Sequence, residues 1–97
     1  MILPTIHLNG TGAEDLLTGY RAAMESVGDA LDVMMKARPN ARDYYVQSDG
    51  AFRQATQEQT AREQKLQSVY DELLALAQHC NDAMCEREAR RAERGVS

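Results

Sequence analysis

The sequence predicts an all-α protein: an antiparallel helical hairpin with a short extended N-terminal leader, assembled into an oligomeric, coiled-coil-like bundle. Two long stretches repeat apolar residues every three or four positions, which is the spacing of one helix face. A polar break, bounded by Pro39 and Gly50, separates them. The 97 residues include no tryptophan and one phenylalanine, so a single chain offers little material for a core and a second copy is expected to help.

The first twelve residues are expected to form the leader. Residues 2–8 are mostly apolar and contain Pro4, which limits the ladder that an extended segment can join. Asn9-Gly10 is a turn signal. Thr11 and Glu14 then match a capping box, in which each side chain satisfies a backbone amide at a helix start. The leader therefore covers residues 1–12.

The first helix is predicted over residues 13–38. Its apolar positions are Leu16, Leu17, Tyr20, Ala23, Met24, Val27, Ala30, Leu31, Met34 and Met35. Gly19 and Gly28 each weaken a helix by up to ~1 kcal/mol relative to alanine, unless they permit close approach of a neighbour. Pro39 disfavours helical geometry at the preceding residue, so the helix should end at Arg38.

The second helix is predicted over residues 51–94, after a loop over residues 39–50. Asp49 is the expected N-cap, with Ser48 as the alternative, and neither proline nor glycine interrupts the following stretch. Its heptad seam runs through Phe52, Ala55, Gln59, Arg62, Leu66, Val69, Leu73, Leu76, Cys80 and Ala83. The seam has few apolar residues around Gln59 and Arg62 and more of them afterwards.

Packing of the two helices follows from this asymmetry within one domain, residues 1–97. We expect Met34 beside Phe52 and Ala55, and the turns at Gln59 and Arg62 opposite the middle of the first helix. The second helix is longer by roughly eighteen residues, so its later turns extend beyond the first. The leader should cover part of residues 73–84, and a second subunit the rest.

Charge and hydropathy exclude several classes of function. The formal net charge of −4 argues against general nucleic-acid binding, which needs a basic surface. No apolar run approaches 18 residues, so we expect no membrane span. The N-terminus lacks the basic region of a signal peptide, and the two cysteines cannot pair along one helix. These features predict a cytoplasmic protein with free thiols.

Metal, cofactor and catalytic sites are not expected. His79 and Cys80 point about 100° apart on a helix, and no fourth zinc ligand accompanies them and Cys85. Cys80 is better interpreted as a small core residue. Gly10-Thr11-Gly12 lacks the lysine of a phosphate loop, so helix capping is the better interpretation there. No nucleophile and base are paired, and the chain is predicted not to be an enzyme.

The loop is the candidate binding site. Arginine offers a planar fork of donors for phosphate or carboxylate, and tyrosine rings offer faces for stacking. The candidate ligand-binding residues are Asn40, Arg42, Tyr44, Tyr45, Gln47 and Arg53. The structural alternative is that Asn40 and Asp43 form turns, Arg42 pairs locally and the tyrosines cap the core of the hairpin.

Three motifs, I-H-L-N-G-T at residues 6–11, E-D-L-L at 14–17 and P-N-A-R-D-Y-Y at 39–45, carry a resemblance. The chain resembles small helical-hairpin proteins of bacteriophages and prophages that have no established activity. The resemblance implies a phage context and action in the cytoplasm of an infected bacterium. It suggests counter-defence by sequestering a small anionic, nucleotide-like signal. The alternatives are an inhibitor or adaptor acting on a host defence protein, and a virion accessory protein.

Overall fold

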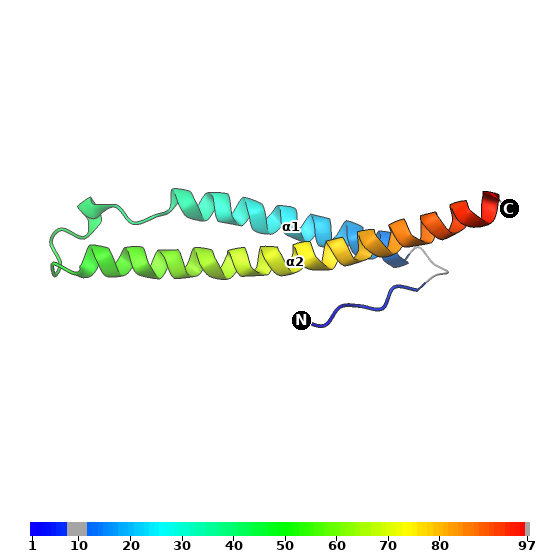
Figure 1. Cartoon of the computed structure of the whole chain (residues 1–97). Helices are drawn as coiled ribbons and strands as arrows, with labels where there is room; N and C mark the ends of the chain where they lie inside the picture. The colour runs from blue at the N-terminus through cyan, green and yellow to red at the C-terminus, as the bar shows by residue number, and fades with distance from the viewer. Residues whose placement is uncertain (8–11, 97) are drawn as a thin grey trace. The chain divides into compact units, whose positions relative to one another are not determined.

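The computed structural model contains two α-helices and one short 3-10 helix, and it describes residues 1–7 and 12–96. Helix α1 spans Gly12–Lys36, the 3-10 helix η1 spans Ala41–Asp43, and α2 spans Ala51–Val96. Figure 1 shows α1, α2 and the connection between them. The described residues contain no strand, and the prediction of an all-helical hairpin is confirmed. The predicted capping box at Thr11 lies outside the described residues.

The chain divides into two compact units. Unit 1 comprises Met1–Glu25 and Asp71–Ser97, and unit 2 comprises Ser26–Tyr70. Each unit therefore holds a section of both helices, and the two units are considered separately.

Unit 1 is organised around an apolar cluster. Leu17, Ala77 and Cys80 are buried, and Cys80 is fully enclosed. Ile6 of the leader packs against this cluster, together with Tyr20, Met24 and Met84. The prediction that Cys80 is a core residue is confirmed. The leader covers the cluster with Ile6, whereas the side chain of Ile2 is 94% exposed.

Unit 2 holds the turn between antiparallel helix sections. Gly28 of α1 lies near Tyr70 of α2, and Met34 lies against Gln59. Gln59 therefore faces the last turn of α1, and the expectation that it lies opposite the middle of that helix is wrong. The connection over residues 37–50 is long enough for α2 to begin two turns beyond this contact.

Gly19 and Gly28, the two glycines in the interior of α1, do not create close helix approaches. A Cβ atom on Gly19 would meet nothing within 4 Å, and one on Gly28 would meet only the ring of Tyr70 at 3.9 Å, an ordinary contact distance. Neither position therefore requires glycine for packing, in contrast to the interpretation that they permit close approach.

Candidate functional site

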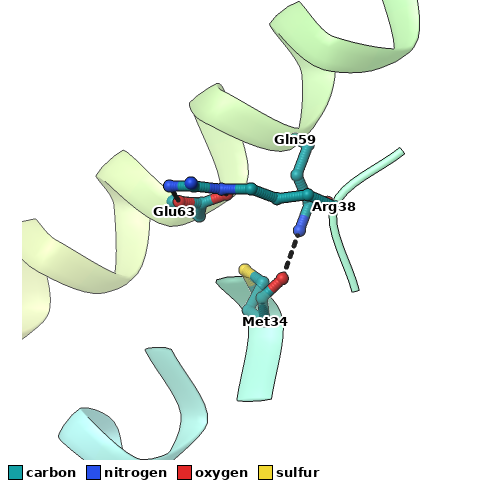
Figure 2. Close-up of polar contacts among 4 residues, drawn as sticks. All are labelled: Met34, Arg38, Gln59 and Glu63. Carbon is teal, nitrogen blue, oxygen red and sulfur yellow. Dashed lines mark hydrogen bonds and ion pairs between the residues drawn. The ribbon is translucent and has the colours of Figure 1, made fainter. Parts of the chain in front are cut away.

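The end of α1 is closed by a side chain from α2. A helix leaves its last carbonyl groups without intrahelical donors. The Met34 carbonyl accepts from the Ala37 amide at 3.0 Å and from Gln59 Nε2 at 2.9 Å. Figure 2 shows Gln59 reaching from α2 to Met34. Gln59 is 7% exposed, and its Oε1 accepts from Arg62 Nη1 at 3.2 Å, so both ends of this buried amide are satisfied.

Arg38 and Glu63 form a two-pronged ion pair beside Gln59. Arg38 Nη2 donates to Glu63 Oε1 at 2.7 Å and Nε donates to Oε2 at 3.1 Å. The guanidinium and carboxylate lie edge to edge in Figure 2. The hydrogen bonds from Arg38 lower the pKa of the Glu63 carboxyl, and those to Glu63 raise the pKa of Arg38. We call Gln59, Arg38 and Glu63 the polar clamp.

An open groove of about 390 Å³ lies beside the polar clamp. Its wall includes the Arg38–Glu63 ion pair, the side chains of Thr56 and Thr60, and the ring of Phe52. Arg38 and Glu63 already bind each other, so the strongest polar groups of the groove are satisfied within the chain. The other residues that line the groove are uncharged, so it offers no further charged group to a ligand.

The loop is ordered by its own hydrogen bonds. Asn40 caps η1, because its Oδ1 accepts from the Arg42 amide at 3.0 Å. Further turns are closed by Tyr44 N to Ala41 O at 3.1 Å and by Gln47 N to Tyr44 O at 3.0 Å. The ring of Tyr44 packs 6.3 Å from the ring of Phe52, centroid to centroid, which fastens the loop to the start of α2.

The predicted site residues therefore divide into two groups. The side chains of Asn40 and Tyr44 make the cap and the ring contact, although Asn40 is itself exposed, whereas the exposed side chains of Arg42, Tyr45, Gln47 and Arg53 make neither contact. Tyr45 is 81% exposed, and its neighbour Val46, which the sequence reasoning missed, is 75% exposed. The sequence offered one signal that Val46 is exposed: it directly follows two tyrosines in a stretch without helical periodicity.

The arginines of unit 2 differ in their partners. Arg38 is bound to Glu63, and Nη2 of Arg62 lies 3.8 Å from Oε2 of Glu58. Within the described part of the chain, the guanidinium groups of Arg42 and Arg53 have no ion pair or side-chain hydrogen bond. These two cations are therefore available to a ligand. We call Arg42, Tyr44, Tyr45, Val46 and Gln47 the tip.

In unit 1, a hydrogen bond from His79 of α2 holds the leader. His79 Nε2 donates to the Pro4 carbonyl at 2.7 Å, so this nitrogen is engaged in holding the leader. Cys80 is buried, which raises the pKa of its thiol, and Cys85 is exposed; both are free. Over residues 1–7 and 12–96, no group of three or more potential metal ligands comes together.

Comparison with protein-family models, curated proteins and solved structures gave no match for this chain. Neither helix, over the residues described, is both long and apolar enough to cross a membrane.

Proposed function

We propose that the chain is a non-enzymatic binding protein that recognises another protein through the tip. The observation that carries this proposal is the exposure of Tyr45 and Val46, at 81% and 75%, on a loop held by several hydrogen bonds. Tyrosine and arginine, together with tryptophan, are enriched among the residues that contribute most of the binding energy at protein interfaces. Arg42 adds an unpaired guanidinium to the same loop.

The order of the loop also supports this proposal. Binding costs less conformational entropy when the contacting segment is already fixed in the free protein. The cap at Asn40 and the contact between Tyr44 and Phe52 provide such fixation without covering Tyr45. Asn40 and Tyr44 then act as supports, and Arg42, Tyr45 and Val46 contact the partner.

The phage resemblance supplies the biological setting of this proposal. In that setting, the protein acts in the cytoplasm of an infected bacterium as an inhibitor or adaptor bound to a host defence protein. An accessory role in the virion uses the same kind of surface with a phage protein as partner. The photo-crosslinking experiment described below would identify the partner.

A second candidate function is sequestration of a small anionic, nucleotide-like signal. The unpaired guanidinium groups of Arg42 and Arg53 favour it, because arginine binds phosphate with two parallel hydrogen bonds. Tyr45 would stack on a base, and Gln47 would bind its polar edge. Calorimetric titration with a panel of nucleotide signals tests this candidate, and heat that disappears in Arg42→Ala would support it over protein binding.

The main proposal is tested by site-specific photo-crosslinking in the infected host cell. A photoreactive phenylalanine analogue replaces Tyr45, and a matched control places it at Gln57, an exposed residue of α2. We expect a discrete protein adduct from position 45 that is lost when Arg42 and Val46 are both replaced by alanine. Equal labelling from positions 45 and 57, or no adduct from position 45, contradicts the proposal.

A further inference from the structure

The leader crosses unit 1 with few attachments. Within residues 1–7 and 12–96, one hydrogen bond joins it to the helices, from His79 Nε2 to the Pro4 carbonyl at 2.7 Å. Ile6 is the leader side chain that packs on the apolar cluster, whereas Ile2 is 94% exposed. Segments with few buried apolar contacts and few hydrogen bonds open at a lower free energy than the whole fold. The leader is such a segment.

An open cavity of about 100 Å³ lies between the leader and the helices of unit 1. Ile6 and His7 line it on the leader side, and Ala13, Ala83 and Met84 line it on the helix side. Atoms that face an open space have no packed partner there and so give up dispersion attraction. The leader is therefore not sealed against the helices next to its apolar contact.

Cys80 lies between the two elements that cover α2 in unit 1. Successive residues of an α-helix are turned by about 100° around its axis. Ala77, which shares the apolar cluster with Leu17 of α1, therefore lies about 60° to one side of Cys80. His79 and Ala83, which lie beside the leader, are about 100° and about 60° to the other side. Cover by α1 on one side and by the leader on the other explains why Cys80 is 0% exposed.

We propose that the leader is a strap that opens while α1 and α2 of unit 1 stay paired, and that its opening exposes Cys80 to solvent. In the open state, Ile6 leaves the apolar cluster and His79 loses the Pro4 carbonyl. Leu17 and Ala77 keep their packing, because the leader contributes no helical hydrogen bond. The strap therefore gates access to the apolar surface beneath Ile6.

Alkylation of the two thiols by iodoacetamide, followed by mass spectrometry of the full chain, tests the strap. The chain has two cysteines, and the exposed Cys85 is the internal reference for the buried Cys80. The rate at each thiol is divided by its rate in urea-unfolded protein, so the ratio measures access alone. We expect a ratio near one for Cys85 and a ratio at least roughly tenfold lower for Cys80.

Variants of the strap should change the rate at Cys80 without changing the rate at Cys85. Ile6→Ala removes part of the apolar contact that holds the strap closed and should raise the Cys80 rate roughly tenfold. His79→Phe keeps a ring but removes the donor to the Pro4 carbonyl, and should raise the rate roughly fivefold. Ile2→Ala is the matched control, because it makes the same substitution at an exposed position of the leader and should leave the rate unchanged.

Low concentrations of urea separate opening of the strap from unfolding of the helices. The effect of urea on an equilibrium scales with the surface exposed, so the Cys80 rate should rise less steeply with urea than the unfolding constant does. Cys80 labelling with the full urea dependence of unfolding would overturn the proposal. So would labelling of Cys80 as fast as that of Cys85, or equal rates in Ile6→Ala and Ile2→Ala. The strap lies in unit 1 and the tip in unit 2, so these outcomes leave the proposed function untouched.

Discussion

Unit 1 and unit 2 contain sections of the same two helices, but different chemistry holds each one together. In unit 1, Leu17, Ala77 and Cys80 form an apolar cluster, to which the leader contributes Ile6. In unit 2, the buried side chain at the helix contact is Gln59, and an ion pair lies beside it. Apolar burial is non-directional, whereas hydrogen bonds require particular partners. Unit 1 is therefore suited to stabilising the fold, and unit 2 to fixing the geometry of the tip.

The largest expected effect comes from the apolar cluster. Leu17→Ala should lower the free energy of unfolding by about 2–4 kcal/mol, because Leu17 is buried and its removal leaves a cavity. Urea denaturation followed by circular dichroism measures this loss. The neighbouring Leu16→Ala is the matched control, since Leu16 is 37% exposed, and its effect should be under about 1 kcal/mol. Equal losses of unfolding free energy in the two variants would mean that the face of α1 with Leu17 stabilises the fold no more than the face with Leu16.

An intermediate effect is expected from the polar clamp. Gln59→Ala removes the hydrogen bond from α2 to the Met34 carbonyl, which keeps the Ala37 amide as a donor, and should cost about 0.5–1.5 kcal/mol. Gln57→Ala, an exposed change of the same type on α2, should cost under about 0.5 kcal/mol. The comparison uses urea denaturation under identical conditions. A Gln59 variant as stable as the control would mean that unit 2 does not depend on this hydrogen bond.

The behaviour of Gln59 marks the limit of what the sequence could predict. Periodicity and Pro39 predicted both helices, and the lean seam at Gln59 was visible. The helix α1 nevertheless ends at Lys36, two residues before the expected end, and the Met34 carbonyl receives Gln59 from 25 residues away. Local propensity carries no information on such a long-range partner. The same is true of Arg38, expected as the last helical residue, which binds Glu63.

The candidate site was predicted in part for the same reason. Turn chemistry indicated the loop and its exposed arginine, because Asn and Asp favour turns wherever they occur. The division between Tyr44, which packs on Phe52, and Tyr45, which is exposed, depends on the direction of each ring. Sequence gives identical residues at these two positions and cannot assign that direction. The oligomeric bundle stays a prediction until the mass in solution is measured.

The smallest effect is expected from the ion pair, and it should depend on pH. Arg38 lowers the pKa of Glu63 below its ordinary value of 4.5, so the pair stabilises the fold above that value and loses its contribution as pH falls below it. Wild-type protein should therefore lose more stability between neutral and acidic pH than Glu63→Gln does. Arg38 is 56% exposed, so added salt should reduce the difference. Identical pH profiles for the two proteins would show that the pair contributes nothing.

Hydrogen exchange read by mass spectrometry tests most directly whether the two units are held differently. We predict the slowest amide exchange at residues 17–24 and 77–84, around Leu17 and Cys80. Faster exchange is predicted at residues 26–36 and 52–60, where polar contacts replace the apolar cluster. Exchange at residues 52–60 that is as slow as at residues 77–84 would contradict the account.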